Sequence, residues 1–358
     1  MSRFLADRFA LLDAYIPGEQ PSDMEYIKLN TNEMPFPPPD KVQAAVESEL
    51  GKMHLYPNPD GSGLINRLAE FYGVNPENVI IGNGSDELLA FSFLAFFETG
   101  VVFPDITYGF YPVYARLYNV PYREIPLLDD LTIDINDYIA IDENIILANP
   151  NAPTGITVGL DDIEAMTGSN QNKVVVIDEA YIDFGGESAV HLTKKQKNLL
   201  VIHTYSKSRS MAGARLGFAI GSPPLIDDLK KMKYSFNPYN VNRLTQAMGA
   251  AALDSEALYT EKRREIMNVR EYAGDRLKNL GFTLTNSKAN FLFCKHPDIR
   301  GFDLYSKLKE KGILIRQWEK PRISDYVRIT IGTKEQMDVL IKATDEILAE
   351  MRKTNEKK

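Results

Sequence analysis

The sequence predicts an α/β fold with a mainly parallel central sheet and helices on both of its faces. Two observations support this expectation. Short β-rich runs alternate with helical patterns along the middle of the chain, which is typical of a parallel sheet with helical crossovers. Two of these runs, VVVI and LLVI, are continuously apolar, as expected for strands that are covered on both faces.

Six segments are predicted as strands of this sheet, because each is short and mostly apolar. They are residues 78–81, 100–103, 144–148, 173–177, 199–204 and 217–221. Helical patterns lie between them at residues 112–118 and 160–167. The longest apolar stretch, residues 88–97, is well short of the roughly 20 residues that cross a bilayer. It predicts a helix buried on all sides.

Near residue 255 the pattern changes, and the sequence predicts a second, smaller α+β domain. A long charged helix is expected at residues 256–280, followed by two amphipathic helices at 302–311 and 334–351. Short strands are expected at residues 282–284, 290–293, 313–315 and 326–331. The N-terminal arm, up to about residue 27, is too short to fold alone and must pack on something larger.

The charge and the metal-binding residue types exclude several classes of function. The 358 residues include 41 Lys and Arg against 49 Asp and Glu, a net charge of -8. An acidic chain is a poor partner for nucleic acid or for an anionic membrane. The four His are scattered and Cys294 is the single cysteine. We therefore expect no metal site, no internal disulfide and a reducing compartment, the cytoplasm.

The residues that follow the predicted strands are the candidates for chemistry, because ligands of such sheets bind at the carboxyl ends of strands. Asp178 and Tyr181 follow VVVI, and Lys207 and Arg215 follow LLVIHT. Each alone has an ordinary alternative: Asp178 as a helix cap, Lys207 as a solvated side chain, Tyr181 as a core tyrosine. The loop GNGSDE at residues 82–87 fits a phosphate at a helix start, or a tight turn.

Taken together, these residues match the needs of pyridoxal phosphate. Its aldehyde requires a lysine, its pyridine nitrogen an acid, and its phosphate a cup of backbone N–H groups with an arginine. Lys207, Asp178 and Arg215 supply the three side chains. The ring also needs a face to stack on, which Tyr108 in DITYGFY can provide. The sequence therefore predicts a pyridoxal-phosphate site.

At this point the sequence resembles the histidinol-phosphate aminotransferase family, whose members are fold type I, aspartate-aminotransferase-like enzymes. The resemblance runs from about residue 11 to 347. It is carried by LNTNEMP, YPNPDG, GNGSDE, TYGFY, NPNAPTG, DEAYIDF, TYSKSRSMAGARLGF and VRITIGT in this order. It implies a large pyridoxal-phosphate-binding domain at residues 29–255, and a small domain formed by residues 1–28 and 256–358.

The resemblance implies a reaction and three catalytic residues. An amino group would move between L-histidinol phosphate and 2-oxoglutarate, giving imidazole acetol phosphate and L-glutamate, in histidine biosynthesis. Lys207 matches the Schiff-base lysine that also carries the 1,3-proton shift. Asp178 matches the acid that keeps the pyridine nitrogen protonated. Tyr181 matches the phenol that hydrogen-bonds the cofactor's ring oxygen.

Further cofactor contacts follow from the same resemblance. The phosphate cup is expected to use the backbone of Gly84, Ser85 and Asp86. It is also expected to use the side chains of Thr204, Ser206 and Arg215. Arginine suits this place because its planar fork binds phosphate oxygens in pairs. Tyr56 matches a tyrosine that reaches the cofactor phosphate of the neighbouring subunit. We therefore expect a homodimer with shared active sites.

Substrate recognition is assigned by resemblance to two arginines and a tyrosine. Arg328 matches the arginine that holds the substrate carboxylate or phosphate, and Arg316 the additional arginine for the phosphate. Tyr15 matches a residue that closes over the substrate. The alternatives are a surface charge for Arg316 and a packing contact for Tyr15.

One departure from the family pattern lies in the motif NPNAPTG. The family commonly has Asn where this chain has Ala152, and Asn151 or a water could substitute.

Rival functions differ in how well they agree with the sequence. A threonine-phosphate decarboxylase or an aromatic amino acid aminotransferase shares the fold and the cofactor, so both stay open. A cofactor-holding DNA-binding regulator would need about 60 additional residues. A nicotinamide-dependent dehydrogenase is disfavoured because no GxGxxG follows the first strand.

Overall fold

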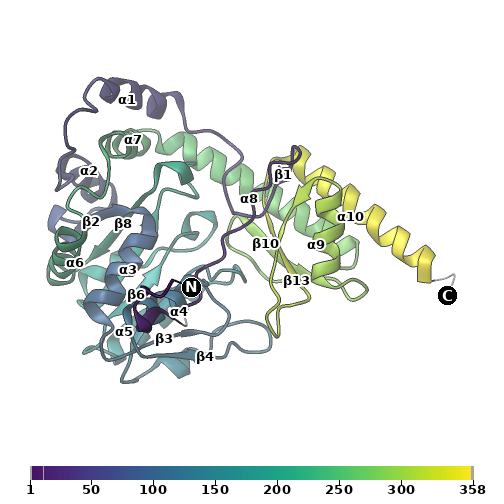
Figure 1. Ribbon diagram of the computed structural model, residues 1–358, viewed down its shortest axis with the longest axis horizontal. Coiled ribbons are helices and arrows are strands. Elements are labelled where there is room, and N and C mark those ends of the chain that lie inside the picture. Colours follow the sequence, from purple (N-terminus) through teal and green to yellow (C-terminus); the bar gives the residue numbers. More distant parts are fainter. Residues whose placement is uncertain (1, 11, 356–358) are drawn as a thin grey trace.

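The computed structural model describes residues 2–10 and 12–355 and shows a large and a small sheet side by side (Figure 1). The large sheet has seven strands in the order β2-β8-β7-β6-β5-β3-β4. Strands β7, β6, β5, β3 and β4 run parallel, and β8 is antiparallel to both of its neighbours. The strands are β2 (Val79–Asn83), β3 (Val101–Pro104), β4 (Tyr122–Ile125), β5 (Asn144–Ala148), β6 (Val175–Asp178), β7 (Leu199–Thr204) and β8 (Leu216–Gly221).

Helices cover both faces of the large sheet, so the predicted α/β class is confirmed. Successive strand residues point to opposite faces: Ile80 and Val176 belong to one apolar cluster, Ile81 and Ile177 to another. The first cluster takes in α3 (Gly84–Phe96), α4 (Phe110–Tyr118) and α6 (Pro223–Phe236), and the second takes in α2 (Ser62–Tyr72), α5 (Leu160–Ser169) and α7 (Arg243–Leu253). Helix α1 (Asp40–Leu50) packs on α7.

The small sheet is built mainly from the C-terminal part of the chain. Its strand order is β12-β13-β10-β9, all antiparallel. These strands are β9 (Thr283–Leu284), β10 (Phe291–Lys295), β12 (Arg316–Gln317) and β13 (Tyr326–Thr330). Helices α8 (Glu256–Asn279), α9 (Gly301–Glu310) and α10 (Lys334–Asn355) contribute to the apolar core on this sheet. Helix α8 leads from the large sheet to this part of the molecule (Figure 1).

The N-terminal arm joins the C-terminal part of the chain, as its shortness led us to expect. Strand β1 (Ile27–Lys28) pairs in parallel with β11 (Ile313–Leu314). The next residue, Leu29, donates its N–H to Leu314 O at 2.8 Å and accepts from Thr330 N at 2.9 Å. This pairing inserts residues 29–33 between the small sheet and the strand ends of the large one.

One strand of the large sheet, β4, and one helix that covers it, α3, differ from expectation. Strand β4 was not predicted, because it is an edge strand whose first three residues are exposed and whose sequence, YREI, lacks an apolar run. Helix α3 begins at Gly84, ahead of the predicted start, and Leu94 on it is 43% exposed, so it is not buried on all sides.

The described residues also form six 3₁₀ helices: Asp7–Phe9, Pro76–Asn78, Ile135–Tyr138, Ile182–Phe184, Ala189–Lys194 and Ala212–Ala214. In residues 2–10 and 12–355, no helix combines the length and the apolar character that crossing a membrane would require.

Candidate active site

A cavity of about 850 Å³ lies where the carboxyl ends of β5, β6 and β7 face the small sheet and the N-terminal arm. Its lining includes every residue that the sequence analysis assigned to the site, except Gly84 and Tyr56. The parallel strands explain this convergence, because their carboxyl ends meet at one edge of the sheet.

Lys207 and Tyr181 lie next to each other in this cavity. Lys207 Nζ donates a hydrogen bond to the backbone O of Thr31 at 3.0 Å and lies 5.8 Å from the centre of the Tyr181 ring. The Tyr181 hydroxyl accepts a hydrogen bond from Asn32 Nδ2 at 2.9 Å. Both candidate catalytic groups are therefore held by the segment of residues 29–33.

Asp178 is the last residue of β6 and is buried. Its carboxylate accepts hydrogen bonds from the Tyr111 hydroxyl at 3.0 Å and from Ala180 N at 3.2 Å. In the described part of the chain, no lysine or arginine forms an ion pair with it. Burial raises the pKa of Asp178 to about 7, although the bond from Tyr111 opposes the rise. A cation placed against this carboxylate would favour its ionised form.

The start of α3 forms an anion cup with β8. Gly84 has a positive φ of 76°, and a Cβ added there would meet Arg215 Nη2 at 2.6 Å. A Cβ added at Gly217 would meet the backbone N of Ser85 at 2.4 Å. Both positions therefore require glycine, which lets the backbone and the guanidinium approach closely. The free N–H groups and the dipole of a helix start favour a phosphate.

Side chains complete the rim of the anion cup. The Thr204 hydroxyl donates to Ser206 Oγ at 3.0 Å, and Arg215 Nη1 donates to the same oxygen at 3.5 Å. Arg215 Nη2 also pairs with Asp86 Oδ2 at 3.0 Å, and the Tyr108 hydroxyl donates to Asp86 Oδ1 at 2.8 Å. Asp86 thus fixes both the arginine and the tyrosine whose ring faces the cavity.

Arg316 and Arg328 form a second positively charged region on the opposite wall. They are directly paired residues of the antiparallel strands β12 and β13, an arrangement in which like charges repel. Of the carboxylates in the described residues, none forms an ion pair with either. Burial lowers the pKa of Arg328, which donates to the backbone O of Asn30 at 3.1 Å. The pair is suited to a small anion with two negative charges.

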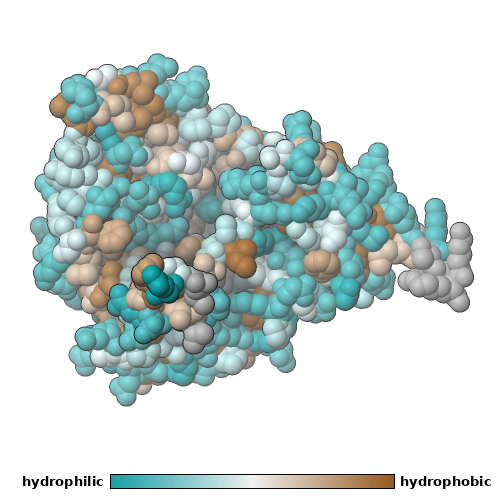
Figure 2. Space-filling model, in the orientation of Figure 1, coloured by the Kyte–Doolittle hydropathy of each residue, from teal (hydrophilic) through white to brown (hydrophobic). Residues whose placement is uncertain are grey.

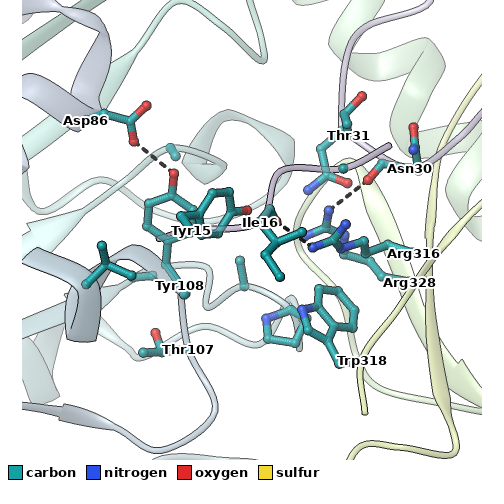
Figure 3. A pocket seen from close by; sticks show the side chains of 18 of the residues that line it. Tyr15, Ile16, Asn30, Thr31, Asp86, Thr107, Tyr108, Arg316, Trp318 and Arg328 are labelled. Atoms are coloured by element: carbon teal, nitrogen blue, oxygen red, sulfur yellow. Dashed lines mark hydrogen bonds between the residues drawn. The ribbon is translucent and has the colours of Figure 1, made fainter. Parts of the chain in front are cut away.

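The N-terminal arm lies against these arginines (Figure 3). Arg316 donates to the carbonyls of Ile16 and Pro17 at 3.0 and 3.2 Å. The Tyr15 ring stacks on Phe110, with ring centres 4.2 Å apart. Burial raises the pKa of Tyr15, and the two arginines partly offset the rise. The arm therefore joins the arginine wall to the aromatic wall that carries Tyr108.

Comparison with known proteins identifies the family. The family model for aminotransferase class I and II matches residues 24–343. The chain belongs to this family. A histidinol-phosphate aminotransferase from Brachyspira hyodysenteriae is 50% identical to it over 345 residues, which cover 95% of this chain and 98% of that protein. One from Clostridium acetobutylicum is 45% identical, covering 98% of this chain and 100% of that protein.

Solved structures confirm the aminotransferase fold. The histidinol-phosphate aminotransferase from Sinorhizobium meliloti, in complex with pyridoxal-5'-phosphate, superposes with a TM-score of 0.84. The two chains are 23% identical, and the match covers 91% of this chain and 92% of that one. An aspartate aminotransferase variant from Thermus thermophilus superposes with a TM-score of 0.82 at 19% identity, covering 97% and 100%. The sequence-based assignment to fold type I is therefore correct.

Ala152 departs from the usual aminotransferase motif, and Asn151 does not substitute for it. Ala152 lines the cavity and is 5% exposed. The amide of Asn151 is already engaged: Nδ2 donates to Ile106 O and to Thr154 Oγ1 at 2.9 and 3.2 Å, and Oδ1 accepts from the Thr107 hydroxyl at 2.8 Å. The structure thus contradicts the suggestion that Asn151 could take this place.

Tyr56 lies outside the cavity of its own chain. Its ring is 77% exposed and stacks on Tyr239, with ring centres 4.5 Å apart, and its backbone O accepts from Arg243 Nη2 at 2.8 Å. Exposed apolar side chains flank it at Leu50 and Leu55. Figure 2 shows a hydrophobic group of side chains in the region where α1 lies in Figure 1.

Four residues in or next to the candidate site were not singled out from the sequence. Tyr111 donates a hydrogen bond to Asp178. Thr31 accepts one from Lys207, and Asn32 donates one to Tyr181. The centre of the Trp318 ring lies 5.6 Å from Arg316 Cζ and 5.3 Å from Arg328 Cζ. Tyr111 lies in the same TYGFY segment as Tyr108, which was the signal in the sequence that could have found it. The role of Thr31 lies in its backbone, which no residue pattern reveals.

Proposed function

We propose that the chain is a pyridoxal-phosphate-dependent aminotransferase that moves an amino group between L-histidinol phosphate and 2-oxoglutarate. The products are imidazole acetol phosphate and L-glutamate, and the reaction belongs to histidine biosynthesis. The curated relatives at 43–50% identity carry the name histidinol-phosphate aminotransferase. The observation that carries the proposal is the facing pair of Arg316 and Arg328, without an acidic partner among the described residues, opposite Lys207 and Asp178.

The donor set of the cavity fits pyridoxal phosphate. Asp178 offers a buried carboxylate without a cation, which a protonated pyridine nitrogen would supply. The anion cup offers backbone N–H groups, hydroxyls and Arg215, and a Cβ at Gly84 or Gly217 would collide with the groups that form it. Tyr108 provides an aromatic face. When bound, pyridoxal phosphate supplies an aldehyde that reacts with amines and a ring that accepts electrons from the adjoining carbon.

The chain's own groups then hold and move protons. Lys207 is the amine that would hold the aldehyde of the cofactor in the resting enzyme, and its free amine would move the proton at the amine-bearing carbon of the substrate. The carbonyl of Thr31, 3.0 Å from Nζ, orients this amine. Asp178 would hold a proton on the ring nitrogen of the cofactor, and Tyr181 would donate a hydrogen bond to its ring oxygen.

The substrate phosphate would lie between Arg316 and Arg328. A dianionic phosphate neutralises both guanidinium groups and can accept paired hydrogen bonds from each. The same pair would hold a carboxylate of glutamate in the other half of the reaction. Tyr15 closes the cavity from the arm side and excludes water from the reacting carbon.

The proposal includes the assembly and the location of the protein. A homodimer with shared sites is supported by the exposed Tyr56 and the apolar side chains around it. Residues 29–255 would form the large domain, and residues 1–28 with 256–358 the small one, supported by the pairing of β1 with β11. Cys294 is buried and free, in keeping with a reducing compartment, and we place the protein in the cytoplasm.

Turnover assays test the proposed substrate. The purified protein, loaded with pyridoxal phosphate, is given L-histidinol phosphate and 2-oxoglutarate, and glutamate is measured. We expect glutamate in amounts equal to the histidinol phosphate consumed. Release of carbon dioxide from phosphothreonine would indicate the decarboxylase instead. Faster turnover of tyrosine or phenylalanine than of histidinol phosphate would indicate an aromatic aminotransferase.

A further inference from the structure

We propose that Asn32 is a positioning residue of this site, whose side-chain amide directs the Tyr181 hydroxyl toward the bound cofactor. Asn32 is 1% exposed and lies at the cavity wall. Its Nδ2 donates to the Tyr181 hydroxyl at 2.9 Å. No other hydrogen bond reaches that hydroxyl from the described residues. The inference rests on the proposed function, because it assumes that Tyr181 contacts the cofactor.

The orientation of the Asn32 amide is fixed by its other hydrogen bonds. Its backbone N donates to Thr330 Oγ1 at 2.9 Å, so the Thr330 hydroxyl must give its own hydrogen elsewhere. That hydroxyl donates to Asn32 Oδ1 at 3.0 Å. Asn290 Nδ2 also donates to the backbone O of Asn32 at 3.0 Å. Since Oδ1 faces Thr330, it is Nδ2 that faces Tyr181.

The backbone at this position restricts which residues can serve. Asn32 has a positive φ of 56°, a conformation that glycine, asparagine and aspartate adopt more easily than other residues. Among these three, only asparagine can donate a side-chain hydrogen bond at neutral pH. The requirements of the fold and of Tyr181 therefore select the same residue type.

The consequence for Tyr181 follows from the valence of a phenol oxygen, which accepts two hydrogen bonds and donates one. The N–H of Asn32 occupies one acceptor site, so the hydroxyl hydrogen has to point away from Asn32. Tyr181 lines the cavity, and no acceptor in the described chain takes this hydrogen. Ala152, which shares an apolar cluster with Tyr181, offers only a methyl group. The hydrogen is thus available to the ring oxygen of the cofactor.

Replacing the amide should change how the bound cofactor titrates. A hydrogen bond donated to the ring oxygen favours its anionic, deprotonated state, so a weaker bond moves the titration to higher pH. For Asn32→Gly we expect the pH midpoint of the visible absorption change to rise by about 0.5 to 1 unit. For Asn32→Asp we expect a larger rise, because a carboxylate oxygen would accept the Tyr181 hydrogen and turn it away from the cavity.

The matched control is Asn119→Gly. Asn119 also has a φ of 56° but is exposed at the end of α4, so this exchange repeats the change of residue type away from the cavity. A positioning role also predicts dependence on Tyr181. The shift caused by Asn32→Gly should disappear when it is measured in a Tyr181→Phe background. If Asn32→Gly does not fold, Thr330→Val provides a second variant, since it frees the amide to rotate and should give a smaller shift with the same dependence.

The experiment is a pH titration of the visible absorption of the cofactor-loaded proteins, without substrate. The inference is supported if Asn32→Gly shifts the midpoint, Asn119→Gly does not, and the Tyr181→Phe background abolishes the shift. An unchanged midpoint, or an equal shift in both backgrounds, would overturn it. Failure to turn over histidinol phosphate would refute only the proposed substrate. A wild-type protein that binds no pyridoxal phosphate would overturn both.

Discussion

The two walls of the cavity differ in how their charges are balanced. On the wall formed by the large sheet, Arg215 pairs with Asp86, and the Asp178 carboxylate is held by Tyr111 and Ala180 N. On the wall formed by the small sheet, Arg316 and Arg328 face each other. In the proposed function, the first wall would hold a permanently bound group, whereas the second would keep its charge for an anion that enters and leaves. The following predictions test this division.

The largest effect is expected at Lys207. Replacing it by alanine removes the amine that moves the substrate proton, so turnover should fall by about 1,000-fold or more. The anion cup is untouched, so the protein should still bind pyridoxal phosphate. Glutamate formation and bound cofactor are measured, with the exposed Lys197→Ala as the matched control. Transamination near the wild-type rate would contradict the assignment of Lys207.

Asp178 predicts a pH-dependent stability of the cofactor-free protein. Its pKa is raised in the folded state, so the folded protein binds the proton more tightly than the unfolded chain does. This contribution is present at low pH and is lost as the pH rises from about 4 to about 7. The Asp178→Asn variant lacks this pH-dependent contribution. Relative to this variant, the free energy of unfolding of the wild type should fall by up to about 4 kcal/mol between pH 4 and pH 8.

Denaturant unfolding of both proteins across this pH range measures the difference. Pyridoxal phosphate should abolish it, because the protonated ring nitrogen stabilises the ionised carboxylate. A difference between wild type and variant that stays constant with pH would mean that Asp178 has an ordinary pKa.

The sequence predicted that the residues of the first wall lie together, but it did not predict how the two arginines of the second wall are paired. Asp178 and Lys207 could be found because a parallel sheet brings the residues after its strands to one edge. The facing register of Arg316 and Arg328 depends on β12, which has two residues and no sequence signal. Asn32 and Thr31 act through contacts with residues about 150 and 176 positions away, and local patterns do not reveal such pairing.

A smaller effect is expected at Arg316. Arg316→Gln removes one of the two positive charges, so the KM for L-histidinol phosphate should rise by about 10- to 100-fold. The visible spectrum of the bound cofactor should not change, because Arg316 lies on the other wall. Steady-state kinetics and a spectrum of the loaded variant measure both. A changed kcat with an unchanged KM would place Arg316 outside the anion site.

The smallest effect is expected at Tyr15. Tyr15→Phe keeps the stacking on Phe110 and removes only the hydroxyl, so the KM should rise about 2- to 10-fold if the hydroxyl bonds the substrate. Unchanged kinetics in Tyr15→Phe, with a large loss in Tyr15→Ala, would show that the ring alone closes the cavity.

The division between the two walls is tested most directly by the fluorescence of Trp318, the single tryptophan of the chain, which lies beside both arginines. The cofactor-loaded protein is titrated with L-histidinol phosphate and with L-histidinol, which lacks the phosphate. The phosphate ester should bind about 100-fold more tightly. This advantage should disappear in the Arg316→Gln, Arg328→Gln double variant while the cofactor spectrum stays unchanged. Equal affinities for both ligands, or an advantage that survives the double substitution, would contradict the account.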